Sequence, residues 1–136
     1  MERPALEAGV EHRFTYVVGD GDTAAALNSI TGESYPRVFA TSKCIALLEL
    51  AAGKLLVPVL RPGELSVGVV VDVKHLAATP VGAKVEAHAR FLETDGKVWS
   101  FEVIARDGGG EVMRGVHKRA IIEEARLLAS AAKRNP

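Results

Sequence analysis

Glu49 is the residue whose type and surroundings point most strongly to chemistry. It interrupts an apolar stretch, CIALLELAAG, and the nearest charged residues of the same predicted helix, Lys43 and Lys54, are six and five residues away. Neither spacing brings two side chains together on a helix. A buried carboxylate without a partner costs several kcal/mol, and such groups cluster at functional sites. We therefore interpret Glu49 as a general base or a nucleophile; the alternative is a glutamate on the helix surface.

Thr41 and His75 are the two residues that could act together with Glu49. Thr41 precedes Glu49 by eight residues, which carry a helix about 80° past two full turns, so both side chains could line one side of a cleft. Amide groups at the helix N-terminus could stabilise a negative oxygen. His75 ends a strand pattern, and its neutral imidazole could exchange a proton near physiological pH. Taken alone, Thr41 could simply cap the helix, and His75 could bond a backbone carbonyl at the edge of the core.

A long helix over residues 41–57 should carry Thr41 and Glu49. Thr41 or Ser42 can serve as its N-cap, and Pro58 ends it because proline cannot continue a helix. A shorter helix is predicted within residues 23–30, and another closes the chain over residues 123–133. The apolar residues of the long helix recur at spacings of three, four and seven, which defines one buried face: Ile45, Leu48, Ala52, Leu55 and Leu56.

Alternating apolar and polar residues predict strands over residues 12–18, 65–75, 83–91, 99–105 and 112–122. Short turns join the last four, which favours an antiparallel sheet. A sheet with one apolar face needs a cover, and the long helix can supply it. We therefore predict an α+β hotdog fold, an antiparallel sheet wrapped around one long central helix, as a single domain over residues 1–136. In the second strand the predicted inward residues are the odd-numbered ones: Leu65, Val67, Val69, Val71, Val73 and His75.

Composition argues against several classes of partner. The chain has 17 Lys+Arg and 17 Asp+Glu, a balance that offers no attraction to nucleic acid or to an anionic membrane. Its one cysteine, Cys44, cannot form an internal disulfide. His12, His88 and His117 lack metal-ligand spacing, so we expect no metal site. The first residues show no apolar signal core, and no apolar run is long enough to cross a membrane. We therefore expect a cytoplasmic protein.

Three strings in the sequence carry a resemblance to a known family: RVFATSKCIALLELAAG, GVVVDVKHLAATPVGAKV and GVHKRAII. In order and spacing they resemble the fluoroacetyl-CoA thioesterase-like family of hotdog proteins, over roughly residues 36–122. The more specific features are a helix with threonine and glutamate eight residues apart, and a strand that ends in histidine before Ala-x-x-Pro-x-Gly. The resemblance thus covers most of the chain.

The resemblance implies a catalytic set of Thr41, Glu49 and His75. It also implies that Gly68 allows a close approach of the backbone to a thioester, and that Arg119 lies near the coenzyme A moiety. Members of the family form dimers with active sites at the subunit interface, so we expect a homodimer. Coenzyme A would arrive as part of the acyl-CoA substrate, with no other cofactor and no metal.

The segment before the long helix departs from the pattern of the family. The fluoroacetyl-specific branch carries two phenylalanines there, which form an apolar lid over the acyl group, whereas this chain has Gly32 and Tyr35. We expect Tyr35 to bind substrate and narrow the entrance, and we predict hydrolysis of a short-chain acyl-CoA thioester. One alternative is a non-catalytic hotdog protein that binds an acyl-CoA or another small ligand, because both functions need the same pocket. A purely structural dimer is the third interpretation.

Overall fold

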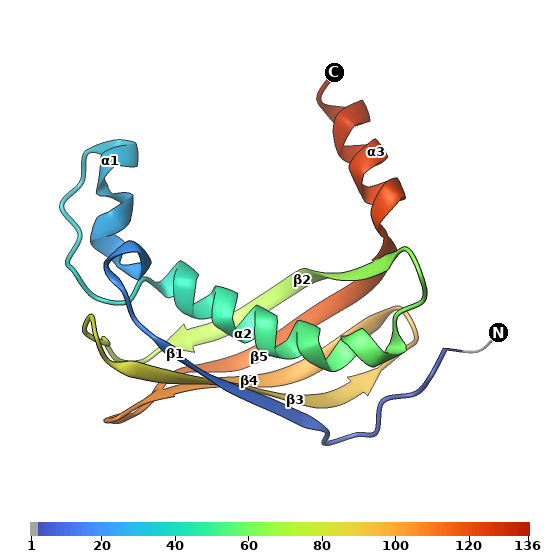
Figure 1. The fold of residues 1–136 in the computed structure, drawn as a ribbon, viewed down its shortest axis with the longest axis horizontal. Helices are drawn as coiled ribbons and strands as arrows, with labels where there is room; N and C mark the ends of the chain where they lie inside the picture. Colours follow the sequence, from blue (N-terminus) through green and yellow to red (C-terminus); the bar gives the residue numbers. More distant parts are fainter. Residues whose placement is uncertain (1–2) are drawn as a thin grey trace.

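The computed structural model describes residues 3–136, which form a five-stranded antiparallel sheet with a long helix across it (Figure 1). The strands are β1 (Glu11–Val17), β2 (Glu64–His75), β3 (Lys84–Thr94), β4 (Val98–Asp107) and β5 (Gly110–Glu123). The α-helices are α1 (Asn28–Thr31), α2 (Thr41–Leu56) and α3 (Glu124–Arg134), and short 3₁₀ segments span Asp20–Asp22, Ala24–Leu27 and Val57–Val59. The strand order is β1-β3-β4-β5-β2, so β1 and β2 are the edges of the sheet.

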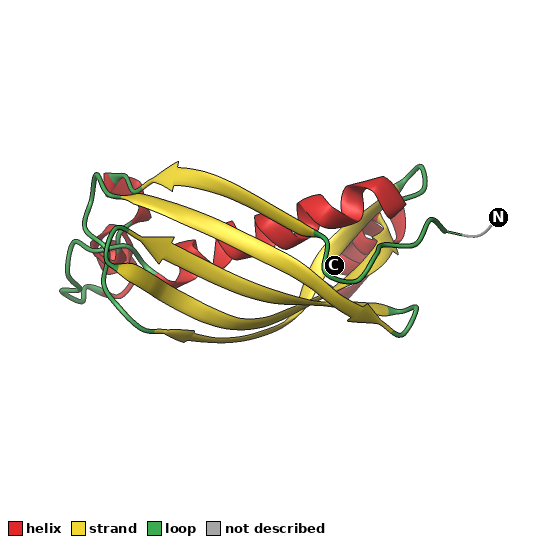
Figure 2. Ribbon diagram, turned by 90° about the horizontal axis from the view of Figure 1, so that it is seen from below, coloured by secondary structure: helices red, strands yellow, loops and turns green. Residues whose placement is uncertain are grey.

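The core lies between α2 and the concave face of the sheet. Figure 2 shows the strands curving along the helix. Burial of each large apolar side chain contributes roughly 1.5–3 kcal/mol, so this single layer supplies most of the stabilisation of the fold. An antiparallel sheet around one long helix is the arrangement that the sequence predicts. The buried residues of this layer include Leu48, Ala51, Ala52 and Leu56 of α2, Val85, Ala87 and Ala89 of β3, and Phe101 and Val103 of β4.

The start of α2 differs from the prediction in a way that matters for the site. Ala40 is the N-cap, with an extended backbone and no side-chain hydrogen bond to the helix. The expectation that Thr41 or Ser42 caps the helix is therefore wrong. Thr41 is the first helical residue, so its hydroxyl is free to bond a group outside the helix. The other end agrees with the prediction, since α2 ends at Leu56 and Pro58 lies in the 3₁₀ segment that follows.

A bulge in β2 changes which of its residues face α2. Gly68 pairs with Arg119 of β5, and Val70 pairs with Lys118, so Val69 is an extra residue in β2. Because side chains alternate along a strand, one extra residue exchanges the inward and outward faces beyond it. The two halves of β2 therefore present residues of opposite parity to the helix.

The predicted inward face of β2 is consequently correct only beyond the bulge. Before the bulge Ser66 and Gly68 face α2, as their contacts with Arg119 and Glu49 show. The expectation that Leu65, Val67 and Val69 point inward is wrong. It assumes that side chains alternate without a break along β2, whereas Val69 has no partner on β5. Beyond the bulge the inward residues are those predicted: Val71, Val73 and His75.

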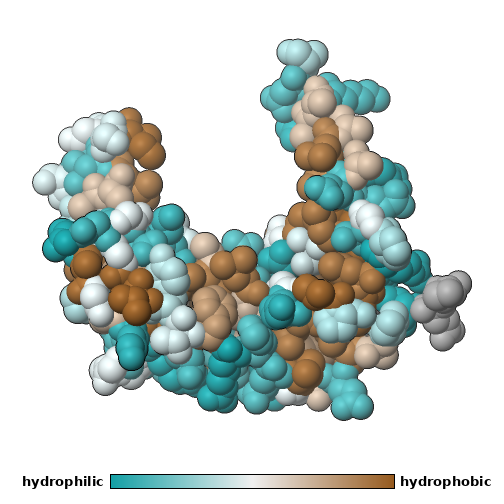
Figure 3. All heavy atoms as spheres, in the orientation of Figure 1, coloured by the Kyte–Doolittle hydropathy of each residue, from teal (hydrophilic) through white to brown (hydrophobic). Residues whose placement is uncertain are grey.

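Two helical projections flank the exposed side of α2. Figure 1 shows α1 and α3 leaving the body of the molecule on the same side, and Figure 3 shows a hollow between them with apolar residues on their facing sides. The helix predicted within residues 23–30 consists of a 3₁₀ segment and one turn of α1, whereas α3 lies within one residue of its prediction. No helix of residues 3–136 combines the length and hydropathy that a membrane span requires. The exposed apolar side chains of this region include Ile30, Leu50, Val57, Leu127 and Leu128.

Candidate active site

The N-terminal end of α2 meets the end of β2 through a hydrogen bond between Thr41 and His75. The Thr41 hydroxyl lies 2.7 Å from His75 Nδ1. The other ring nitrogen, Nε2, is shielded from solvent and has no hydrogen-bond partner within residues 3–136. A histidine with one nitrogen held and the other unpaired can give or take a proton at the unpaired position. The fold thus brings together two of the three residues that the sequence indicates.

Glu49 lies two turns further along α2, against β5. Its Oε2 is 3.5 Å from Arg119 Nη1 and 3.9 Å from His117 Nε2. Eight residues advance a helix by about 12 Å, so Glu49 and the Thr41–His75 pair form two separate clusters within one chain. Helix α2 has no cation next to Glu49, and Arg119 of β5 supplies one.

The surroundings of Glu49 are more open than the sequence suggests. Its side chain is 37% exposed, so the interpretation of Glu49 as a buried carboxylate is wrong. The carboxylate borders an open groove of about 540 Å³ that runs along α2 past Leu50 and Arg119. The other side of Glu49 borders a small apolar pocket whose remaining residues are Ile45, Leu48, Val71, Val73, Val103 and His117. A carboxylate at the boundary of an open groove can meet both water and a ligand.

Arg119 is fixed beside Glu49 by three hydrogen bonds. Its Nε donates to Ser66 Oγ at 2.9 Å, and its Nη2 donates to the Ser66 carbonyl at 2.8 Å. Its Nη1 donates to His117 Nε2 at 3.1 Å. The sequence prediction missed both Ser66 and His117. His117 could have been found, because it lies two residues before Arg119 and so shares its face of β5; Ser66 could not, since its orientation depends on the bulge.

Burial sets the charge states in this cluster. It lowers the pKa of His117 below the usual value, outweighing the opposite effect of the hydrogen bond to the Val70 carbonyl, so His117 is neutral at neutral pH. Burial also lowers the pKa of Arg119 below its usual value, while the nearby Glu49 carboxylate opposes this effect, and the guanidinium is a cation at neutral pH. Buried Cys44 has its pKa raised to about 12 and stays a thiol, which argues against a thiolate nucleophile.

Gly68 lies directly against the Glu49 carboxylate. A Cβ at this position would fall 2.3 Å from Glu49 Oε2 and 3.0 Å from His117 Cε1. Any side chain at position 68 would therefore displace the carboxylate. The resemblance implies that Gly68 lets the backbone approach a thioester, and in the structure the group against Gly68 is the Glu49 carboxylate.

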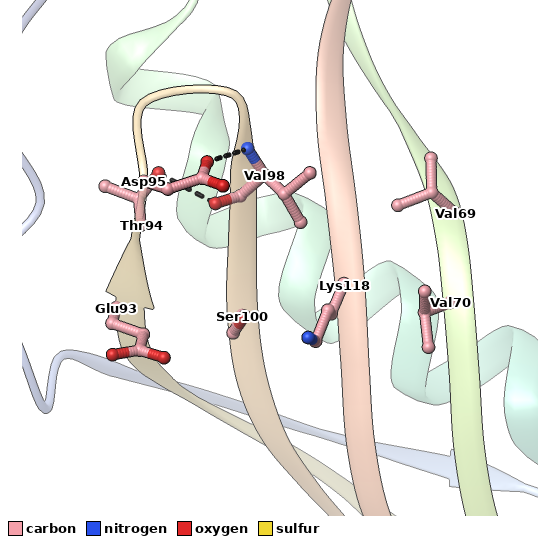
Figure 4. Close-up of a pocket in the computed structure, with 8 residues that line it drawn as sticks. All are labelled: Val69, Val70, Glu93, Thr94, Asp95, Val98, Ser100 and Lys118. Carbon is pink, nitrogen blue, oxygen red and sulfur yellow. Dashed lines mark hydrogen bonds between the residues drawn. The ribbon is translucent and has the colours of Figure 1, made fainter.

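A second pocket lies on the outer face of the sheet (Figure 4). It measures about 440 Å³ and is lined by residues of β2, β3, β4 and β5 and of the turn between β3 and β4, with Lys118 near its centre. Lys118 and Ser100 alternate with the inward residues of β5 and β4, so this pocket lies on the opposite face from Thr41, Glu49 and His75. No group of histidine, cysteine and carboxylate side chains within residues 3–136 is suited to hold a metal ion.

Comparisons with known proteins agree with this geometry. A family model described as fluoroacetyl-CoA-specific thioesterase matches residues 18–125. The fluoroacetyl-CoA thioesterase of Streptantibioticus cattleyicolor is 36% identical over 131 residues, which cover 93% of this chain and 94% of that protein. The chain belongs to the fluoroacetyl-CoA-specific thioesterase family. The family predicted from the sequence is thus confirmed, and with it the class of thioester hydrolases.

Solved structures of thioesterases share the fold of this family member. The structure of the fluoroacetyl-CoA thioesterase FlK matches with a TM-score of 0.93 and 32% identity, covering 98% of this chain and 100% of that one. A thioesterase superfamily member from Thermus thermophilus matches with a TM-score of 0.85 and 27% identity, covering 95% and 93% of the two chains. The predicted hotdog fold is confirmed.

Tyr35 is the predicted site residue that stands apart from both clusters of this thioesterase. It lies in the projecting loop after α1, and it is 55% exposed. Its backbone N–H donates to Asn28 Oδ1 at 2.8 Å, and its carbonyl accepts from Asn28 Nδ2 at 3.2 Å. No hydrogen bond links Tyr35 to Thr41, Glu49 or His75. The asparagine fixes the loop and leaves the Tyr35 side chain accessible.

Proposed function

We propose that this chain hydrolyses short-chain acyl-CoA thioesters, releasing a carboxylic acid and free coenzyme A. The relative from Streptantibioticus cattleyicolor is named as a fluoroacetyl-CoA thioesterase. The observation that carries the proposal is the Glu49 carboxylate, which borders an open groove next to Arg119 and against Gly68. A carboxylate held in this way can take a proton from water beside a bound thioester.

In this proposal Glu49 is the general base. It takes a proton as the water oxygen attacks the thioester carbonyl carbon, and collapse of the tetrahedral intermediate breaks the C–S bond. The Thr41 hydroxyl holds the His75 ring through Nδ1, and His75 assists proton transfer to the departing sulfur or orients the reacting carbonyl. Positioned proton transfer contributes roughly 10²–10⁴-fold. Arg119 and Tyr35 would contact the substrate, and coenzyme A enters only as part of it.

Oxygen isotopes detect a nucleophilic Glu49 if its anhydride with the acyl group is hydrolysed at the glutamyl carbonyl. A single turnover in H₂¹⁸O with enzyme in excess should place one ¹⁸O in the product acid, because the base mechanism adds water directly to the thioester. If Glu49 instead formed an anhydride, water attacking the glutamyl carbonyl would leave ¹⁸O in the protein and none in the first product. Mass spectrometry of the acid and of the peptide that contains Glu49 reads both outcomes.

We further propose that the enzyme is a homodimer in which the Thr41–His75 pair of one protomer and Glu49 of its partner serve one thioester. The two clusters lie about 12 Å apart along α2, which is far for groups acting on one carbonyl. The edge strand β2 is unpaired on one side, and it exposes Val69, Val70 and Val71. Pairing with a second copy would cover this edge.

A mixed dimer tests the shared site. Glu49→Gln and His75→Gln proteins, each expected to be inactive, are co-expressed with different tags and the mixed dimer is isolated. If each site takes residues from both chains, the mixed dimer regains activity, because one of its two sites contains neither substitution. Sites built within one chain restore none. Light scattering at micromolar concentration should first give the mass of a dimer, and a monomer mass would contradict this arrangement.

The activity itself is tested by free-thiol release from acetyl-, propionyl-, fluoroacetyl- and palmitoyl-CoA. We expect turnover of the short thioesters, with palmitoyl-CoA the slowest, because the pocket next to Glu49 is small and lined by branched side chains. Calorimetry with the same compounds tests the alternative, a protein that binds acyl-CoA without hydrolysing it. Tight binding of an acyl-CoA without thiol release would contradict hydrolysis and favour a binding protein.

A further inference from the structure

His117 connects the Glu49 cluster to the bulge in β2. Its side chain is 1% exposed, its Nδ1 lies 2.8 Å from the Val70 carbonyl oxygen, and its Nε2 lies 3.1 Å from Arg119 Nη1. We infer that His117 is a positioning residue for the proposed hydrolysis, which anchors the Arg119 guanidinium to the bulge and so holds it beside Glu49. The inference rests on the proposed function, but the contacts that carry it do not.

The two neighbours of His117 dictate its tautomer. A carbonyl oxygen only accepts hydrogen bonds, so Nδ1 must carry the proton that is donated to Val70. A guanidinium only donates, so Nε2 must be unprotonated to accept from Arg119. The neutral ring with its proton on Nδ1 satisfies both contacts, and a protonated ring would lose the second. Burial of His117 favours this neutral form.

The hydrogen bond between His117 and Arg119 also affects the position of Arg119 relative to Glu49. Ser66 takes the Nε and Nη2 donors, which leaves Nη1 as the end of the guanidinium that faces both His117 and Glu49. With hydrogen bonds to Ser66 alone, the guanidinium plane of Arg119 could still tilt about its Nε–Nη2 edge. The bond to His117 removes this freedom and fixes Nη1 at 3.5 Å from Glu49 Oε2. Misplacement of a catalytic group by about 1 Å can cost about 10²-fold in rate, so this restraint should matter for activity.

Another histidine offers a matched comparison. His88 of β3 is also buried, and it also contacts one glutamate and one arginine: Nε2 lies 2.9 Å from Glu11 Oε1, and Nδ1 lies 3.3 Å from Arg106 Nη1. It alternates with the core residues Ala87 and Ala89, so it lies on the outer face of the sheet. Each histidine thus lies beside one glutamate and one arginine, and of the two only His117 contacts the Glu49 cluster.

Asparagine and glutamine at position 117 separate the two contacts. The asparagine amide occupies the place of Nδ1 and can still donate to Val70, but it cannot reach Arg119. The glutamine amide occupies the place of Nε2 and can still accept from Arg119. We expect His117→Asn to lower kcat/KM by about 10²-fold and His117→Gln to lower it by roughly tenfold or less. His88→Asn and His88→Gln should both keep wild-type kinetics.

The inference is overturned if the two substitutions at His117 reduce activity equally, because His117 would then serve only packing. Near-wild-type activity of His117→Asn overturns it as well. Should either protein fail to fold, ¹⁵N NMR of the histidine side chains in the wild-type enzyme still decides. We expect a protonated Nδ1 and a bare Nε2 for His117, and a protonated Nε2 excludes the bond from Arg119. A wild-type protein that releases no thiol from any acyl-CoA contradicts the proposed function, and the NMR result then still reports on the contact.

Discussion

The two ends of the candidate site are held in different ways. At the start of α2, Thr41 and His75 make one hydrogen bond between two residues that the sequence indicates. Midway along α2, Glu49 depends on a network that reaches through Arg119 and His117 of β5 to the bulge in β2. The first cluster needs only that a helix end and a strand end meet. The second needs the register of two strands to be correct.

This difference sets the expected size of each effect. A neutral hydrogen bond contributes roughly 0.5–1.5 kcal/mol net, and one to a charged group roughly 1.5–3 kcal/mol. The Glu49 carboxylate, the proposed general base, should matter most, followed by the residues that place it, and then by the Thr41–His75 pair. An ion pair away from both clusters should affect stability and not activity.

Replacing Glu49 by glutamine should give the largest effect. Glutamine keeps the shape of the side chain but cannot act as a base, so kcat/KM on the best acyl-CoA should fall by about a hundredfold or more. Because Glu49 is partly exposed, the melting temperature should change little. Glu64→Gln is the matched control, since Glu64 also pairs with an arginine, Arg3, at a distance from the groove. Near-wild-type turnover of Glu49→Gln would make Glu49 a structural residue.

Replacing Gly68 by alanine should come next. The new Cβ would fall 2.3 Å from Glu49 Oε2, and the flexible carboxylate is what has to move. Displacement by about 1 Å should cost about 10²-fold in kcat, with the fold retained. Gly108→Ala is the control, because nothing lies within 4 Å of a Cβ at Gly108. If both alanine variants turn over substrate equally well, the position of the Glu49 carboxylate is not critical.

Replacing Thr41 by valine should have a smaller effect. Valine keeps the shape but removes the hydroxyl that holds His75 Nδ1. Loss of this one hydrogen bond, worth roughly 1 kcal/mol, predicts a decrease in kcat/KM of about five- to tenfold. Thr41→Ser retains the hydroxyl and should recover most of the activity. If Thr41→Ser lowers kcat/KM as much as Thr41→Val does, the methyl group of Thr41 matters for activity and the bond to His75 does not.

The Arg3–Glu64 ion pair should give the smallest effect, and on stability alone. The Arg3 side chain holds the pKa of Glu64 at about 2, well below its usual 4.5. A folded-state pKa below the unfolded value stabilises the fold above pH 4.5, and this contribution is lost as the pH falls towards 2. Melting temperatures of wild type and Glu64→Gln should therefore converge as the pH falls from 6 to 3. A constant difference would show that the pair contributes nothing through ionisation.

The predictions from the sequence failed where a local rule was extended past a non-local event. Alternation predicted the inward residues of β2 correctly from Val71 to His75, and wrongly before the bulge. The preference of threonine for helix caps suggested that Thr41 caps α2, whereas its hydroxyl bonds His75, which is 34 residues away. The spacing of charged residues correctly indicates that α2 has no cation next to Glu49, but the exposure of Glu49 depends on an open groove that no spacing reveals.

The long helix, the eight-residue spacing of Thr41 and Glu49 along it, and the strand that ends at His75 could all be predicted from the amino-acid sequence. These follow from helix periodicity and strand alternation, which act over neighbouring residues. The contacts of Arg119 and His117 with Glu49, and the position of Gly68 against its carboxylate, could be found only in the folded protein. Those contacts depend on the register between β2 and β5, which is set by pairing between residues some 50 positions apart and shifted by a single unpaired valine.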